Sequence, residues 1–206
     1  MAGRKQFDMD AVLDAAMTQF WRAGYADTSV DDLSRATGLN RSSIYSSLGD
    51  KDALFVRCLE RYATRYGEKY DAALSCAADR PLAAVRAFFE VTLERIADPD
   101  LPDGCLVAQS AMAIPVLSSS VAARTNEAVG LQRVRLGAAL RAGGLHEATA
   151  DDFAVHVAAV NLSLAVMSRS GASAEQLRAI VGVTLGALAH ALGARGSAAG
   201  LEEPPA

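Results

Sequence analysis

The segment between Thr28 and Lys51 restricts the fold of this chain most, because its pattern predicts two short helices joined by one sharp turn. The first helix is expected over residues 30–37 and the second over residues 41–48. Gly38 stands between them and can adopt the left-handed backbone that lets a chain leave a helix abruptly. Asn40 is a good N-cap for the second helix. Two helices connected in this way form a helix-turn-helix.

The second helix of this pair has one apolar face and one polar face. Ile44 and Leu48 are four residues apart and should point inward together. The opposite face carries no large apolar residue. The side chains expected on that outer face and its flanks are Ser42, Ser43, Tyr45 and Ser46. A polar helix presented in this way can enter the major groove of DNA.

Arg41 begins this helix and is its one long side chain able to reach a base edge. An arginine can hold a guanine with two hydrogen bonds, whereas a serine hydroxyl donates or accepts and therefore discriminates weakly. We expect sequence recognition to depend on Arg41 and on DNA shape, with the serines permitting close approach.

Residues on both sides of the pair extend the pattern. Upstream, an apolar stripe predicts a helix that ends at Gly24, and downstream Lys51 opens a further helix. The block from about Met9 to Phe55 resembles the DNA-binding domain of the tetracycline-repressor-like (TetR) family of transcriptional regulators. The matching positions are Phe20, Gly24, Tyr25, Thr28, Val30, Leu33, Gly38, Leu39, Ile44, Tyr45, Gly49, Asp50, Lys51, Leu54 and Phe55. An ordinary helical hairpin within a bundle is the alternative interpretation.

The resemblance implies a regulator that binds double-stranded DNA as a homodimer and responds to a small-molecule effector. It also implies phosphate contacts by Thr28, at the start of the first helix of the pair, and by Tyr45 and Lys51. A helix N-terminus, a phenolic hydroxyl and an ammonium group each suit a phosphate. The structural alternatives are that Thr28 acts as a cap and that Tyr45 packs. A repressor released from a pseudo-palindromic operator is expected, although the chain itself does not distinguish repressor from activator.

The net charge of −4 is unevenly distributed along the 206 residues. Residues 1–66 carry nine basic and nine acidic side chains, so the whole acidic excess lies in residues 67–206. Overall charge therefore does not argue against DNA binding, because a local basic rim can still attract phosphates. A composition that is 51% hydrophobic, with repeated 3.6-residue periodicity and no alternating strand pattern, favours an all-α fold.

The chain is expected to contain about nine helices, three of them in the DNA-binding head. Their expected ranges are about 8–24, 30–37, 41–48, 51–76, 81–97, 105–114, 120–142, 150–170 and 174–194. Ser119 or Ser120 is the expected cap of the seventh helix, and Thr149 that of the eighth. We expect a DNA-binding domain over residues 1–50, an effector-binding and dimerisation domain over 51–194, and a disordered tail over 195–206.

The eighth and ninth helices predict a dimer. No charged residue occurs from Phe153 to Ser168 or from Ala179 to Ala194, and helices apolar nearly all round need cover on more than one side. Gly182 and Gly186 would permit close helix contact. We expect a homodimer through these two helices as a four-helix bundle. The alternative is that both helices are buried inside a monomeric core.

Several apolar side chains after residue 60 are candidates for an effector pocket, although each could equally be ordinary core. They are Tyr62, Tyr66, Phe88, Phe89, Met112 and Met167. Cys105 is a separate candidate, because a thiol at the start of the sixth helix favours a reactive thiolate. Its Gly-Cys-Leu setting resembles a branch of the family that includes the N-ethylmaleimide-reductase repressor, where a cysteine senses electrophiles. Packing is the alternative role for Cys105.

Other chemistry is not expected. The three cysteines and three histidines lack metal-ligand spacing, and we expect neither a metal nor another cofactor. Enzyme motifs such as a phosphate-binding glycine loop or a nucleophile elbow are missing. Acidic residues interrupt the N-terminus and the longest uncharged stretch is a poor membrane span, so we expect a cytoplasmic protein without a membrane partner. The competing function is a helical protein-interaction module that does not bind DNA.

Overall fold

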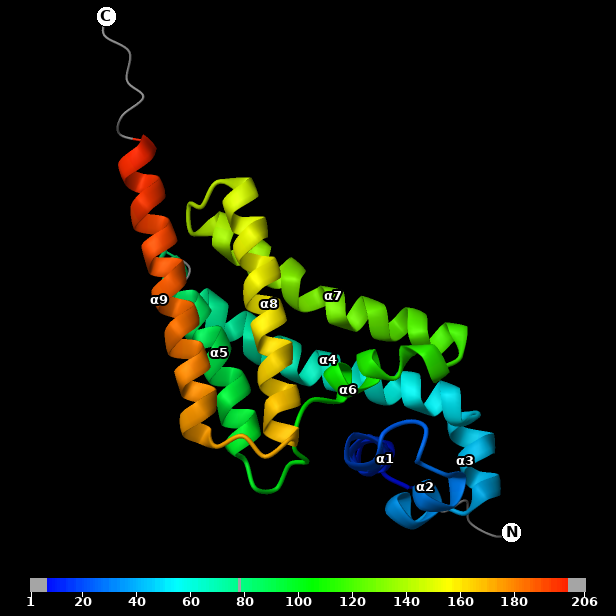
Figure 1. Ribbon diagram of the computed structural model, residues 1–206. Coiled ribbons are helices and arrows are strands. Elements are labelled where there is room, and N and C mark those ends of the chain that lie inside the picture. The colour runs from blue at the N-terminus through cyan, green and yellow to red at the C-terminus, as the bar shows by residue number, and fades with distance from the viewer. Residues whose placement is uncertain (1–6, 78, 200–206) are drawn as a thin grey trace, which may run out of the picture. The chain divides into compact units, whose positions relative to one another are not determined.

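A computed structural model describes residues 7–77 and 79–199, and over these residues the chain is helical throughout (Figure 1). It contains nine α-helices and one short 3-10 helix within that range. The helices are α1 (Met9–Ala23), α2 (Val30–Thr37), α3 (Arg41–Leu48), α4 (Lys51–Ser75), α5 (Pro81–Ala97), α6 (Leu106–Met112), η1 (Ile114–Val116), α7 (Ser119–Ala142), α8 (Glu147–Arg169) and α9 (Ala174–Ala199). The predicted all-α class is confirmed.

Three predicted helix ends were wrong. The Ser118 hydroxyl accepts from the Val121 amide at 3.4 Å, so the cap of α7 precedes both serines proposed for it. Helix α8 starts two residues before the predicted cap Thr149, since the Ala150 amide already bonds to the His146 carbonyl. Thr149 lies inside the helix and is buried. Helix α9 continues to Ala199, so the predicted disordered tail does not begin at residue 195. Its remaining part, residues 200–206, lies outside the described residues.

The chain divides into two compact units. Unit 1 comprises residues up to Glu68 together with Asp98–Leu131, and unit 2 comprises Lys69–Ala97 together with residues from Gln132 onward. Unit 1 holds α1 to α3, most of α4, α6, η1 and the first half of α7. The expected boundary at residue 50 concerns a different division, between DNA binding and effector binding, and it stays a prediction.

The core of unit 1 is built around α1, which packs against α2 and α6. Phe20 and Trp21 at its end are fully buried. The Phe20 ring meets the edge of Phe55 from α4 at 4.8 Å, and the Trp21 ring meets Tyr62 at 5.0 Å. The indole N–H of Trp21 donates to the Asp103 carbonyl at 3.1 Å, which satisfies the one polar group of this side chain.

An ionic cluster also joins α1 to α4. The Asp14 carboxylate accepts from Arg61 Nε at 2.7 Å and from Arg65 Nη2 at 2.5 Å, while Arg61 Nη1 reaches Asp10 at 2.7 Å. The hydrogen bond from Arg61 holds the pKa of Asp14 below its ordinary value. These pairs link positions about fifty residues apart in sequence and fix the rotation of α1 on α4.

Gly24 lets α6 approach the end of α1. Its φ of +88° is a conformation that side chains rarely adopt, and its amide closes the last turn of α1 on the Phe20 carbonyl at 2.8 Å. A Cβ atom placed on Gly24 would lie 2.8 Å from the Gln109 side-chain nitrogen of α6. The glycine therefore meets a backbone requirement, at a point where the end of the Gln109 side chain lies close by.

In unit 2, α5, α8 and α9 pack on one another (Figure 1). Phe88, Phe89 and Phe153 are buried among them. A chain of hydrogen bonds crosses this unit, from Tyr70 to Thr92 at 2.7 Å and from Thr92 to Asn161 at 2.6 Å. It ends where the Asn161 amide donates to Gln132 Oε1 at 3.0 Å. The buried side chains of Tyr70, Thr92 and Asn161 are thereby paired with one another, as burial of polar groups favours.

Substituting the two turn glycines should show the cost of their backbone conformations. Gly38→Ala meets no atom within 4 Å and carries only the left-handed backbone cost, about 1 kcal/mol. Gly24→Ala should lower the free energy of unfolding by at least about 2 kcal/mol, measured by urea denaturation, because a φ of +88° with a ψ of +167° lies in a region almost restricted to glycine. A Gln109→Ala background should change this difference little, since the added Cβ meets only the flexible end of that side chain. Equal costs for the two glycines would contradict this account.

Candidate nucleic-acid interface

The helix-turn-helix is closed by local hydrogen bonds at each junction. Ser29 and Asp32 form a capping box at the start of α2, in which the Asp32 amide donates to Ser29 Oγ at 3.1 Å and the Ser29 amide donates to the Asp32 carboxylate at 2.8 Å. Gly38 has a φ of +69° in the turn, as predicted. Asn40 caps α3 by accepting from the Ser43 amide at 2.8 Å, which confirms its predicted role.

Helix α3 presents the two faces that its sequence predicts. Ile44 and Leu48 are buried, at 1% and 3% exposure. Ser42, Tyr45 and Ser46 are exposed and Ser43 is half-buried, so the outer face is polar. Tyr45 is 54% exposed, unlike the buried aromatic side chains of the unit, which favours an outward role over packing. The contacts of these residues with DNA stay predictions.

Arg41 does not project alone from α3. Its Nε donates to Asp31 Oδ1 of α2 at 2.5 Å, and its Nη2 donates to Asp31 Oδ2. The hydrogen bond from Arg41 holds the pKa of the Asp31 carboxyl below its ordinary value. Reasoning from sequence missed Asp31, because the pair depends on how α2 and α3 cross and leaves no local signature at a separation of ten residues.

Lys51 lies at the start of α4 among groups of the α1–α2 turn. Its ammonium stands 4.3 Å from the centre of the Tyr25 ring and 3.5 Å from the Ala26 carbonyl oxygen. Partial burial lowers the pKa of Lys51. Lys51 is therefore held in a defined place beside the helix-turn-helix rather than extended into solvent.

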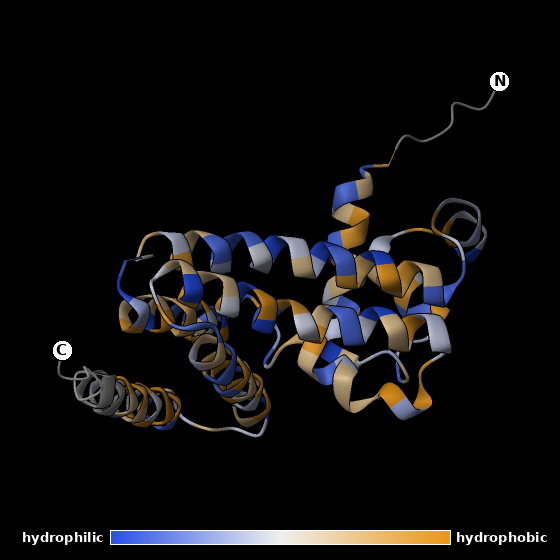
Figure 2. Ribbon diagram, turned by 90° about the horizontal axis from the view of Figure 1, so that it is seen from above, coloured by the Kyte–Doolittle hydropathy of each residue, from blue (hydrophilic) through white to orange (hydrophobic). Residues whose placement is uncertain are grey.

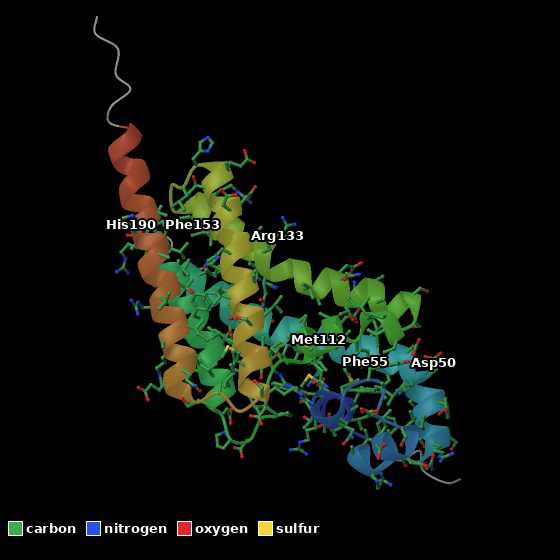
Figure 3. The ribbon with its side chains drawn as sticks, in the orientation of Figure 1. Asp50, Phe55, Met112, Arg133, Phe153 and His190 are labelled. Carbon is green, nitrogen blue, oxygen red and sulfur yellow. The ribbon has the colours of Figure 1, made fainter. Side chains whose placement is uncertain are left out.

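A polar cluster beneath Lys51 ties three segments of unit 1 together. The Tyr25 hydroxyl hydrogen-bonds the Asp52 carboxylate, and burial together with this bond raises the pKa of Tyr25 to about 12. Hydrogen bonds from Ser118 and from Tyr25 hold the pKa of Asp52 below its ordinary value. Asp50, in the turn before α4, caps that helix by accepting from the Ala53 amide at 2.8 Å, and Phe55 lies further along α4 (Figure 3).

The hydroxyl of Thr28 is used inside the turn after α1. The Thr28 side chain is fully buried, and its hydroxyl donates to the Gly24 carbonyl at 2.6 Å. The predicted phosphate contact at the start of α2 would therefore come from backbone N–H groups, and it stays a prediction. Ser29, one residue later and exposed, caps α2 instead.

The six candidates for an effector pocket are divided between the two units, three in each. Tyr62 and Tyr66 are buried in unit 1 beside Trp21, and Met112 of the same unit is 71% exposed at the end of α6 (Figure 3). The other three, Phe88, Phe89 and Met167, belong to unit 2. The four aromatic residues are buried, and their role in effector binding stays a prediction.

Cys105 occupies the N-cap of α6, close to the predicted start of that helix. Its side chain is buried, and its sulfur accepts a hydrogen bond from the Tyr62 hydroxyl at 3.3 Å. Burial of this kind favours the packing role over reaction with an electrophile from solvent. Within the described residues, no group of three or more histidine, cysteine or acidic side chains is placed to hold a metal ion.

A separate groove of about 160 Å³ lies between α4 and α7 in unit 1. Its lining residues are Leu59, Glu60, Ala63, Arg124, Glu127, Ala128 and Leu131. Arg124 crosses one side of it with an ion pair to Glu60 at 2.6 Å. None of the side chains proposed from sequence for effector binding lines this groove.

Comparison with known proteins places the chain among helix-turn-helix regulators. Residues 12–58 match the family described as "Bacterial regulatory proteins, tetR family". The HTH-type transcriptional repressor ComR of Escherichia coli strain K12 is 31% identical over 186 residues, covering 88% of this chain and 89% of that protein.

Two solved structures show the same architecture. A cysteine mutant of the regulator CifR, complexed with 26-base-pair operator DNA, is 27% identical with a TM-score of 0.73, covering 88% of this chain and 97% of that chain. The reduced form of Escherichia coli NemR has a TM-score of 0.75, covering 85% and 93% of the two chains, at 18% identity. The likeness to NemR concerns the fold alone.

The exposed hydroxyl of Tyr45 provides a direct test of this surface. Tyr45→Phe removes one donor from α3 while keeping the ring, and it should weaken binding to duplex DNA about tenfold, as loss of a hydrogen bond to a charged phosphate does. Fluorescence anisotropy with a labelled duplex measures the change. The thermal midpoint should stay the same because the ring is mostly exposed. Unchanged affinity would remove Tyr45 from the interface.

Proposed function

The chain belongs to the tetR family of bacterial regulatory proteins and is a transcriptional regulator, and we propose that it is a repressor that binds a pseudo-palindromic operator as a homodimer and releases it when a small molecule binds. The observation that carries DNA binding is the exposed, polar outer face of α3, with an arginine at its first position. The repressor name of ComR and the operator complex of CifR support the same function.

In the proposed complex, α3 lies in the major groove. Arg41 contacts a guanine, the side chains of Ser42, Ser43 and Ser46 allow close approach, and Tyr45 contacts a phosphate. Lys51 contributes a further phosphate contact from its fixed place over Tyr25. Because residues 1–66 have no net charge, one head attracts DNA weakly, and two heads on two half-sites are needed for tight binding.

We infer that the homodimer forms through α8 and α9. Val155 and Val166 on α8 and Val183 on α9 are exposed, the last at 76%, and hydrophobic residues are spread over much of α9 (Figure 2). A Cβ at Gly182 or Gly186 would meet no atom within 4 Å, so the backbone of α9 is open to close approach. A second copy would cover these faces on both helices.

A membrane is the other medium that could cover the same helices. By length and composition α8 and α9 could each cross one, with 39% and 28% of their most apolar windows buried. We favour the second copy, since the polar side chain of Asn161 in the middle of α8 is already paired inside unit 2. A symmetric dimer is also the common way for a helix-turn-helix protein to engage two half-sites.

For effector release, we propose that residues 51–194 bind a small molecule and pass its effect to residues 1–50 through α6. Support comes from three contacts within unit 1. The Asp103 carbonyl holds Trp21, Gln109 lies against Gly24, and Cys105 meets Tyr62. A shift of α6 would therefore disturb α1 and α4 together. Electrophile sensing by Cys105 is the less favoured trigger because the thiol is buried.

Selection from a random-sequence duplex library tests the function directly. The full chain should enrich a pseudo-palindrome, and the affinity for it should fall steeply between 50 and 200 mM salt, roughly as the number of phosphate contacts dictates. Arg41→Ala should lower the preference at one base pair per half-site by about tenfold, the usual scale for losing one bidentate base contact. If no duplex is enriched, the alternative of a protein-interaction module replaces this proposal.

Sedimentation of the full chain tests the dimer. The wild type should sediment at twice the 21.5 kDa chain mass at micromolar concentration, and Val183→Arg should shift it toward the monomer by placing a charge in the proposed interface. Val134→Arg on α7, which also alters an exposed valine of unit 2, is the matched control and should remain dimeric. A monomeric wild type would refute the interface.

A further inference from the structure

The pairing of Arg41 with Asp31 bears on how the proposed DNA reader works. The carboxylate of Asp31 sits on α2 and takes two hydrogen bonds from the guanidinium of Arg41 on α3. Both side chains are more than half exposed, so this pair lies on the surface of the helix-turn-helix. Isolated surface ion pairs contribute little to stability, which makes a purely stabilising role a weak explanation for a two-bonded geometry here.

The atoms used in the pair leave one edge of the guanidinium available. An arginine has five N–H donors in a planar fork, and Asp31 takes one from Nε and one from Nη2, along the side edge. The end edge, formed by Nη1 and the second hydrogen of Nη2, faces away from the Asp31 carboxylate. That edge has the spacing of two donors that the O6 and N7 acceptors of guanine require.

We infer that Asp31 is a positioning residue that sets base specificity: it holds Arg41 in one rotamer with the end edge directed at a guanine, and it neutralises the charge that would otherwise bind any phosphate. This inference rests on the proposed function. Holding the side chain in advance reduces the rotamer entropy lost on binding. Neutralising the guanidinium lowers affinity for unrelated sequences, because phosphate attraction carries no sequence information.

When Asp31 loses its charge, the two effects predict a higher affinity for unrelated sequences and a weaker preference at the base pair that Arg41 contacts. In Asp31→Asn, Arg41 is released and one negative charge leaves the surface. Affinity for a scrambled duplex should rise about threefold at 100 mM salt, and the salt dependence should steepen by about one phosphate contact for each protomer. Preference at the base pair that depends on Arg41 should fall about fivefold or more. A structural role for Asp31 would weaken binding to all duplexes alike.

Asp27→Asn is the matched control. Asp27 is an exposed carboxylate in the turn before α2, so its replacement removes the same charge without touching Arg41. It should raise affinity for the scrambled duplex while leaving the base preference intact. Asp31→Glu, which keeps the charge and the acceptors, should retain the preference, whereas Asp31→Gln should lose it. This second pair keeps the test valid if Asp31→Asn weakens the start of α2 and unfolds the head.

The experiment is the same duplex selection, run side by side for the wild type and these variants, with the helix content of each variant checked by circular dichroism. Loss of preference at the Arg41-dependent base pair in Asp31→Asn and Asp31→Gln, but not in Asp27→Asn or Asp31→Glu, supports the inference. An unchanged preference in folded Asp31→Asn and Asp31→Gln overturns it while leaving DNA binding intact. A wild type that enriches no duplex overturns the proposed function itself.

Discussion

The placement of Trp21 is the interaction on which unit 1 depends. Its ring is buried at the end of α1, edge-on to Tyr62 of α4, and its indole N–H holds the Asp103 carbonyl just before α6. One side chain thus joins the first helix of the head, the helix that follows the head and the segment that leads into α6. Because the interior packs closely, a movement of α6 cannot leave α1 unchanged. This contact gives the proposed effector response a physical route to the DNA-binding surface.

On that surface, neighbouring groups already hold two of the side chains expected to contact DNA. Tyr45 is exposed, and Lys51 is held over the Tyr25 ring. Arg41, the expected base reader, is held by Asp31. In the proposed complex, such positioned groups and the zero net charge of residues 1–66 would favour discrimination between sequences over strong attraction to DNA in general.

Much of the fold could be predicted because its signals are local. Gly38 and Asn40 define the turn and the start of α3 through their own backbone and side-chain preferences, and the periodicity of Ile44 and Leu48 identifies the buried face. The start of α8 was harder to predict, because threonine is a common N-cap residue, whereas Thr149 is buried inside the helix. The effector candidates stay predictions for a related reason, since an aromatic residue in an apolar helix has the same sequence signal in a pocket and in a core.

The sequence by itself determined the all-α class, the helix-turn-helix and the polar face of α3, since each follows from contacts within a few residues along the chain. Only the tertiary structure decided that the Thr28 hydroxyl is used inside the turn, that Cys105 is buried against Tyr62, and that Asp31 holds Arg41. Those three outcomes depend on how helices cross and how closely they approach. Such packing is set by shapes and distances between segments far apart in sequence, which no short pattern records.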